Sequence, residues 1–305
     1  MLRMFKKTNQ LKDSVMSTQI LIKGKADIEI LKTCINIAKD LENKLSAYKE
    51  DSFISLINKN AGKKPISCPP EVIEVLKIAV KIAQETEGRF DPTVGALTQK
   101  TYGFGTKKEK IPEEKEILEK KRLVNYKEIE IKDNKIFLKK KGMALDLGGI
   151  GKGFACEKII EYLHKKGIPN ALVSIGGEIC CYGKHWNIGI KHPREDRFIA
   201  VITTKEGKTT ISTSGDYERF IDSMDYHHIL DTKTGKQNNF YSSVTLVSEG
   251  FKGARLDAYA TAIFNSSTIN PFIKKDFDMM YIQKENNNIT ITEGFLSKVE
   301  KLVMF

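Results

Sequence analysis

The stretch ALDLGGIGKGFACEKIIEYL, residues 144–163, passes from an apolar run through a cluster of glycines into a helical pattern. A Gly-rich turn between a strand and a helix lets backbone N–H groups approach an anion. Asp146 and Lys152 flank the glycines. The lysine suits an anion, whereas Asp146 fits such a site only if it accepts from a ligand hydroxyl or amine. A tight structural junction is the alternative interpretation, and this stretch alone leaves both open.

Two common phosphate-binding motifs do not match this stretch. A Walker loop needs Gly-x-x-x-x-Gly-Lys-Ser/Thr, but Asp146 stands six positions before Lys152 and Gly153 follows it. A dinucleotide fingerprint needs Gly-x-Gly-x-x-Gly, and Phe154 occupies the place of the third glycine. Neither a P-loop nor a Rossmann site is therefore indicated.

The segments around this stretch predict an α+β fold. Apolar residues at helical spacing predict helices over residues 27–45, 69–88, 113–122 and 254–264, and one that ends near residue 167. Alternating patterns predict hairpins around residues 133–134 and 279–292, and strands at residues 171–175, 186–190, 198–204, 209–214 and 243–248. Strands joined mainly by hairpins, with helices inserted between groups, favour a mainly antiparallel sheet.

Length and composition are those of an ordinary globular protein. With 305 residues, 29% charged and 40% hydrophobic, the chain can form a single domain over residues 1–305, with two closely packed lobes as the alternative. Residues 1–14 are expected to be a flexible N-terminus. The 50 basic and 39 acidic residues give a net charge of +11. The basic runs are short and typical of a solvated face, so we expect no nucleic-acid partner.

The sequence favours a cytoplasmic location. No run approaches 18 consecutive apolar residues, so no membrane span is expected. The first fifteen residues lack the apolar stretch of a signal peptide and a cysteine for lipid attachment. The five cysteines lack zinc-site spacing and are typical of reduced core thiols. An exported location stays open if a leader was removed.

Five short stretches carry specific residue patterns. They are LSAY at 45–48, GRFDPTVG at 88–95, the stretch at 144–163, STSGDY at 212–217 with YHHILD at 226–231, and LDAYATA at 256–262. Each has a structural explanation when taken alone. Asp91 can cap a helix, Asp257 and Thr261 can pair on one helix face, and a His pair before an apolar residue is more often structural than catalytic.

Together and in this order, the five stretches resemble the FAD:protein FMN transferase family, also called ApbE. The resemblance extends from about Met16 to about Ile282, and Met16-Ser17-Thr18 is similar to the family's Met-Gly-Thr. It implies an α+β, T-fold-like architecture and a Mg²⁺-dependent enzyme. Such an enzyme moves FMN from FAD onto a Ser or Thr hydroxyl of an acceptor protein and releases AMP. An FAD pyrophosphatase that gives FMN and AMP, or a non-catalytic flavin-binding protein, is the alternative.

The resemblance also implies a role for individual residues. FAD would be lined by Met16, Tyr48, Arg89, Phe90, Asp91, Asp146, Lys152 and Ile229. The metal, with Mg²⁺ against Mn²⁺ left open, would be held by the Gly149 carbonyl, Asp257, Thr261 and Ala260. His228 matches the catalytic histidine.

The chemistry of these side chains agrees with the resemblance. Hydroxyl attack on a pyrophosphate needs cations and precise positioning, because charge spreads over several phosphoryl oxygens. Carboxylate, hydroxyl and carbonyl oxygens suit Mg²⁺, and Lys152 can act as a point charge on the pyrophosphate. His228 has the right unperturbed pKa for a general base, and the Tyr48 and Phe90 rings can pack on flavin or adenine.

The acceptor is expected to be another protein. Family acceptors carry a Ser/Thr-Gly-Ala-Ser/Thr motif, which this chain lacks, since its Gly-Ala pairs are followed by Leu97 and Arg255. A flexible incoming segment also reaches the phosphorus more easily than a residue fixed in the core.

Overall fold

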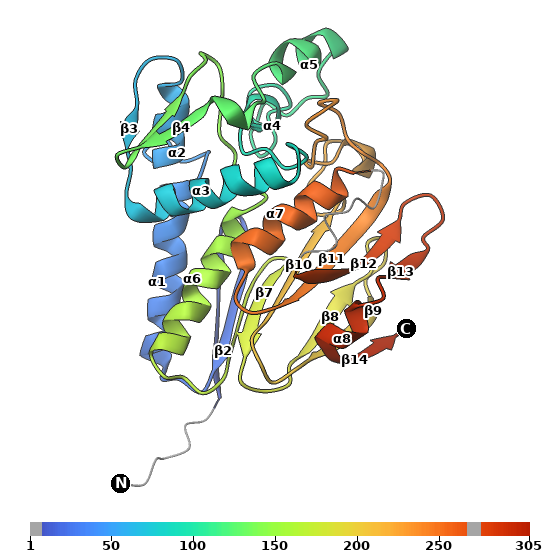
Figure 1. The fold of residues 1–305 in the computed structure, drawn as a ribbon. Coiled ribbons are helices and arrows are strands. Elements are labelled where there is room, and N and C mark those ends of the chain that lie inside the picture. The colour runs from blue at the N-terminus through green and yellow to red at the C-terminus, as the bar shows by residue number, and fades with distance from the viewer. Residues whose placement is uncertain (1–7, 267–275) are drawn as a thin grey trace.

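The computed structural model describes residues 8–266 and 276–305, and its centre is an eight-stranded antiparallel sheet (Figure 1). Its strands pair in the order β1 (Asn9–Val15), β2 (Thr18–Gly24), β6 (Ala171–Ile175), β7 (Glu178–Tyr182), β10 (Thr209–Gly215), β11 (Tyr241–Glu249), β12 (Phe277–Gln283) and β13 (Ile289–Ile291). Every neighbouring pair in this sheet is antiparallel. The predicted α+β fold is confirmed.

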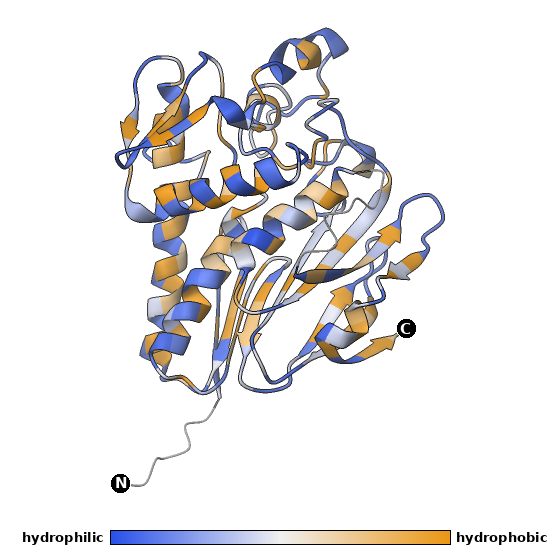
Figure 2. Ribbon diagram, viewed as in Figure 1, coloured by the Kyte–Doolittle hydropathy of each residue, from blue (hydrophilic) through white to orange (hydrophobic). Residues whose placement is uncertain are grey.

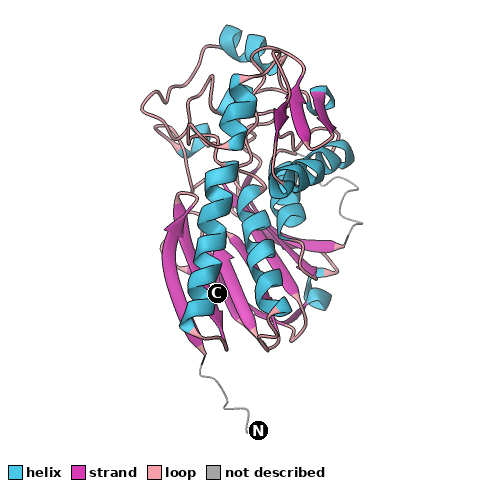
Figure 3. Ribbon diagram, turned by 90° about the vertical axis from the view of Figure 1, so that its left-hand side faces the viewer, coloured by secondary structure: helices cyan, strands magenta, loops and turns pink. Residues whose placement is uncertain are grey.

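Three helices cover one face of this sheet, as the view turned by 90° makes plain (Figure 3). They are α1 (Ile28–Leu45), α6 (Gly151–Lys165) and α7 (Gly253–Phe264). Apolar residues of α1, such as Leu31, Ala38 and Leu45, recur at helical spacing and are buried. The main hydrophobic core lies between these helices and the sheet (Figure 2).

A small sheet covers the opposite face. Its strands pair in the order β14 (Val299–Met304), β9 (Phe198–Thr204) and β8 (Asn187–Lys191). Along β6, Val173 faces the main core and Leu172 faces a second core that contains Trp186 and Ile202. Because side chains alternate between the two faces of a strand, both faces of the large sheet are buried.

The remaining elements lie beyond one end of the sheet, apart from α8 (Phe295–Lys298), which precedes β14 (Figure 1). They are α2 (Phe53–Lys59), β3 (Ile66–Ser67), α3 (Pro70–Glu85), α4 (Gly95–Thr98), α5 (Glu114–Lys121), β4 (Ile129–Lys132) and β5 (Lys135–Leu138), with two 3₁₀ turns at Tyr126–Glu128 and Met224–Tyr226. The predicted hairpin at Asp133-Asn134 is confirmed, since both residues have positive φ in the turn from β4 to β5.

The N-terminal segment differs from its prediction. Residues 9–14, expected to be flexible, form most of β1, which pairs with β2 along its length. Met16 and Ser17, with φ of 52° and 61°, make the tight turn that closes this hairpin. A glycine would adopt the Ser17 conformation freely, which accounts for the glycine in the related motif. Residues 1–7 of the expected flexible segment lie outside the described residues.

Two glycines bring α6 and α7 into backbone contact. A Cβ atom at Gly153 would lie 2.1 Å from the carbonyl oxygen of Gly253 and 2.7 Å from Cβ of Asp257. A Cβ atom at Gly253 would in turn lie 2.1 Å from the Gly153 carbonyl oxygen. This contact places Asp257 of α7 directly against the first turn of α6.

We expect Gly153→Ala to destabilise the protein, because the added methyl group has no space and the helices must separate. Overpacking of this kind costs about 1–3 kcal/mol, so the midpoint of thermal unfolding should fall by several degrees. Gly151→Ala in the same turn is the matched control, since a Cβ there meets nothing within 4 Å. Equal unfolding temperatures for the two variants would contradict the tight crossing.

Candidate active site

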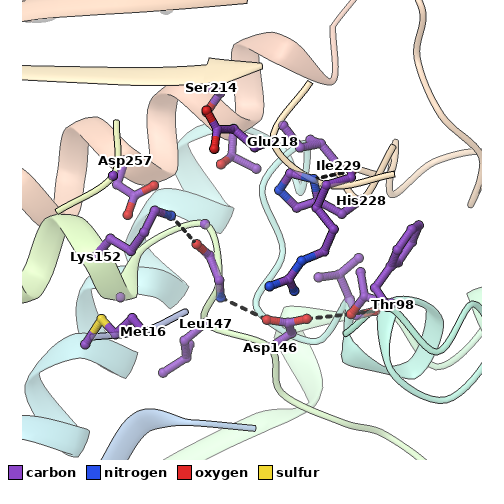
Figure 4. Close-up of a pocket in the computed structure, with 18 of the residues that line it drawn as sticks. Met16, Thr98, Asp146, Leu147, Lys152, Ser214, Glu218, His228, Ile229 and Asp257 are labelled. Carbon is purple, nitrogen blue, oxygen red and sulfur yellow. Dashed lines mark hydrogen bonds between the residues drawn. The ribbon is translucent and has the colours of Figure 1, made fainter. Parts of the chain in front are cut away.

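A pocket of about 310 Å³ opens where the ends of the large sheet, α6 and α7 meet the upper segments. Twelve of the predicted site residues line it, and they come from separate parts of the chain: Met16, Tyr48, Arg89, Phe90, Asp91, Asp146, Gly149, Lys152, His228, Ile229, Asp257 and Thr261. Figure 4 shows Lys152, Asp257, Asp146 and His228 directed into this space. The fold therefore gathers the five sequence stretches into one site.

Ala260 does not line the pocket. Asp257 and Thr261 lie at positions i and i+4 on the pocket face of α7, whereas the Ala260 side chain is fully buried in the core. Ala260 is near the site only because it lies on α7 between Asp257 and Thr261. Its side chain is a methyl group that faces the core and offers no ligand to a metal.

Asp146 fixes the Gly-rich turn. Its Oδ2 accepts a hydrogen bond from Thr98 Oγ1 at 2.6 Å, and its Oδ1 accepts from the Gly148 N–H at 2.8 Å (Figure 4). The Asp146 N–H donates to the Pro92 carbonyl at 2.8 Å. Asp146 thus ties the turn to the segment that precedes α4, and its acceptor capacity is partly used by the protein itself.

Asp91 is a buried organiser of the neighbouring loop. Its Oδ1 accepts from the N–H and the hydroxyl of Thr93, at 2.8 and 2.6 Å, and its Oδ2 accepts from the Tyr126 N–H at 2.9 Å. Burial raises the pKa of this carboxyl despite these hydrogen bonds. Asp91 therefore orders the loop that carries Arg89 and Phe90.

Lys152 lies among acidic side chains. Its Nζ donates to the Gly148 carbonyl at 2.9 Å. Burial opposes its charge, yet the carboxylates of Asp257, Glu178 and Glu218 raise the pKa of Lys152 above its usual value. Burial also raises the pKa of Asp257, and the Lys152 charge works against that rise. The lysine is a fixed ammonium at the base of the pocket.

His228 is oriented by a backbone carbonyl. Its Nδ1 lies 3.0 Å from the Arg219 carbonyl oxygen, which can only accept, so we assign the proton to Nδ1 and the lone pair to Nε2. The pKa of His228 is lowered to about 3, chiefly by burial and also by the charges of Arg219 and Lys152, while the hydrogen bond to Arg219 opposes the fall. The ring is neutral at neutral pH and can take up a proton.

Three oxygen atoms beside the α6–α7 crossing fit a hard metal ion. The Gly153 N–H donates to Asp257 Oδ2 at 2.9 Å, and the described residues make no hydrogen bond to the Gly149 carbonyl. A Cβ atom at Gly149 would lie 2.7 Å from Thr261 Oγ1, so the turn and the hydroxyl are in contact. Residues 8–266 and 276–305 contain no cluster of three His, Cys, Asp or Glu side chains for a metal. A metal here would use carbonyl, hydroxyl and carboxylate oxygens, as Mg²⁺ prefers.

Glu178 and Arg219 are among the pocket residues that the sequence did not predict. Glu178 is almost fully buried at the start of β7, and its Oε2 has no hydrogen-bond partner among the described residues. A strand for residues 178–182 was not predicted, although the Gly176-Gly177 pair before it signals a turn. Arg219 lies in the loop after the Thr-Ser-Gly-Asp-Tyr motif, and no local pattern marks it.

Comparisons with known proteins agree with this site. The model of the ApbE family matches residues 15–275. An FAD:protein FMN transferase of Vibrio cholerae is 30% identical over 251 residues, which cover 79% of this chain and 74% of that protein. One from Klebsiella pneumoniae is 27% identical over 286 residues, covering 90% of this chain and 89% of that protein.

Solved structures are similar over nearly the whole chain. The crystal structure of the ApbE protein from Thermotoga maritima has a TM-score of 0.87 at 28% identity and covers 97% of this chain and 100% of that one. The flavin transferase ApbE from Vibrio cholerae, with a TM-score of 0.83 at 24% identity over 96% of this chain and 100% of that one, shares the fold.

The helices of residues 8–266 and 276–305 include none with the length and apolar composition that a membrane span requires.

Proposed function

The chain belongs to the ApbE family and is a transferase, and from this premise we propose that it moves FMN from FAD onto a Ser or Thr hydroxyl of an acceptor protein. The FMN would be held by a phosphoester bond, AMP would be released, and Mg²⁺ would be required. The observation that carries the proposal is the meeting of a neutral histidine, a fixed ammonium and three hard oxygen donors in one pocket.

The proposed reaction is a phosphoryl transfer. The acceptor hydroxyl oxygen bonds to the FMN-side phosphorus of FAD, and the bond from that phosphorus to the AMP oxygen breaks. The hydroxyl proton passes to Nε2 of His228, whose orientation is held by the Arg219 carbonyl. AMP leaves with the bond's electron pair as a phosphate monoester.

The chain's own residues position the reactants. Tyr48, 46% exposed at the pocket, and Phe90 offer ring surfaces for flavin or adenine. The Gly149 carbonyl, Asp257 and Thr261 would hold Mg²⁺, which would supply positive charge to the phosphate oxygens. The three donors lie beside the Gly-rich turn, so its backbone can approach the pyrophosphate.

The test is an incubation with FAD and Mg²⁺, with and without an acceptor bearing a Ser/Thr-Gly-Ala-Ser/Thr segment, followed by intact mass measurement. We expect the acceptor to gain the mass of one FMN and the enzyme to gain none. A matched acceptor in which alanine replaces the final Ser or Thr should stay unmodified. Rapid FMN production without transfer would instead support a pyrophosphatase, and binding without AMP release would support a flavin-binding protein.

A further inference from the structure

Three basic side chains line the pocket, namely Arg89, Lys152 and Arg219, and they differ in the protein groups around them. The Arg89 guanidinium lies 3.4 Å from the Asp231 carboxylate and donates to the Asn265 carbonyl at 3.3 Å. Lys152 faces several carboxylates and donates to a main-chain carbonyl, as described above. The charge on Arg89 is thus offset by an ion pair, and the ammonium of Lys152 already has a protein partner and acidic groups around it.

Arg219 is the third, and its charge is not balanced in this way. Across residues 8–266 and 276–305, no carboxylate lies within ion-pair distance of its guanidinium. Burial raises the pKa of Tyr48 to about 12, the carboxylates of Asp146 and Glu109 add to the rise and Arg219 opposes it, so all three charged groups lie around Tyr48. Asp146 already accepts from two protein donors, and Oε1 of Glu109 accepts from the Gly105 N–H at 2.6 Å.

The guanidinium lies at the side of the pocket that carries Tyr48. A Cβ atom at Gly105 would be 3.2 Å from Arg219 Nη1 and 3.3 Å from Tyr48 Cε1, so the two side chains lie side by side. The main-chain carbonyl of the same arginine orients His228. The charge of the Arg219 side chain also acts on the His228 ring, so the guanidinium is near it as well. Because the base must reach the attacking hydroxyl, the phosphorus that is attacked has to lie close to His228, and hence within reach of that guanidinium.

We propose that Arg219 is a further catalytic residue, whose guanidinium binds the non-bridging oxygens of the phosphate that is transferred. This assignment rests on the proposed function. The planar guanidinium presents paired donors that match phosphate oxygens, and negative charge spreads over those oxygens in the transition state. Arg219 thus adds a second positive charge, beside the ammonium of Lys152, on the side of the pocket where the acceptor hydroxyl attacks.

The first test compares the binding of FAD and riboflavin by flavin fluorescence in EDTA. Riboflavin has the same ring but no phosphate. Arg219→Met should weaken FAD binding about tenfold, the loss typical of a charge-assisted hydrogen bond, and leave riboflavin binding unchanged. Arg122→Met, which removes an exposed arginine after α5, is the control and should match the wild type for both ligands. An unchanged FAD affinity, or an equal loss for both ligands, would overturn the assignment.

The second test measures AMP release with Mg²⁺ and acceptor. Arg219→Met should lower kcat/KM about 10²-fold, as the loss of a preorganised donor does, and Arg219→Lys should recover part of it. The carbonyl that orients His228 is main chain, so both variants keep that contact, and unfolding temperatures check it. An unaltered kcat/KM in Arg219→Met would refute the role. Absence of transfer by the wild type would refute the proposed function instead, and the binding comparison would still report on Arg219.

Discussion

Asp257→Asn is expected to lower AMP release by about 10³-fold or more while the protein stays folded. Asparagine keeps the size of the side chain and an oxygen that can accept from the Gly153 N–H. It removes the one carboxylate among the three proposed metal donors. Metal ions contribute several kcal/mol to phosphoryl transfer, and each 1.36 kcal/mol is a factor of ten. The measurement is AMP release at saturating FAD over a range of Mg²⁺ concentrations.

Mg²⁺ binding by calorimetry gives a second readout for this prediction. Asp257→Asn should show no binding, and Thr261→Val, which removes only a hydroxyl, should bind more weakly than the wild type. Glu157→Gln in α6 is the control, because it changes a carboxyl that bonds to the Ala254 N–H and does not line the pocket. Full AMP release by Asp257→Asn at ordinary Mg²⁺ concentrations would remove Asp257 from the metal site.

His228→Ala is expected to lower the maximal rate of transfer about 10²–10⁴-fold, the usual contribution of a general base. The affinity for FAD should change much less, because the imidazole acts on the acceptor proton. The neighbouring His227 is the matched control. It is buried, its Nε2 faces the Asn238 carbonyl at 3.3 Å, and it does not line the pocket. His227→Gln should therefore alter stability more than turnover, and near-normal turnover of His228→Ala would place the base elsewhere.

The pH profile of the wild type provides an independent check on His228. Its pKa, lowered from 6.5 to about 3, keeps the ring neutral well below neutral pH. We therefore expect kcat/KM to lack an acid limb near pH 6.5, since this parameter reports the free enzyme. The lowered pKa also means that the unfolded chain binds the proton more tightly, so stability falls as the pH drops below about 6.5. Rates at low pH need a parallel measurement of folding.

The sequence predicted most elements because their patterns are local. The helix over residues 28–45 and the turn at Asp133-Asn134 follow from spacing and from residues that tolerate positive φ. The strands β1, β2, β3, β7 and β14 were not predicted. β1 is mostly polar and β7 is apolar on both faces, so neither shows clear alternation. The sequence did predict α3, because Pro70 marks the start of the helix and its buried apolar residues recur at helical spacing.

The sequence predicted twelve of the residues that line the site. It did not predict their hydrogen bonds and protonation states. The motifs marked His228, but its tautomer depends on the Arg219 carbonyl nine positions away. They marked Asp146 as a ligand-binding residue, and its bonds to Thr98 and Gly148 appear only once α4 packs against the turn. The assignments of these residues to FAD and metal stay predictions until the variants are measured.

The glycine contact between α6 and α7 has a consequence for how the site tolerates change elsewhere. Gly153 and Asp257 are 104 positions apart, and the segment between them contributes four of the eight strands of the large sheet. Folding alone closes this long loop, so the residues proposed to hold the metal are already ordered before any ligand arrives and binding has little chain entropy to overcome. An insertion beside the exposed Gly207, in the turn between β9 and β10, should therefore leave ligand affinity intact, whereas a single methyl group at the crossing disturbs it.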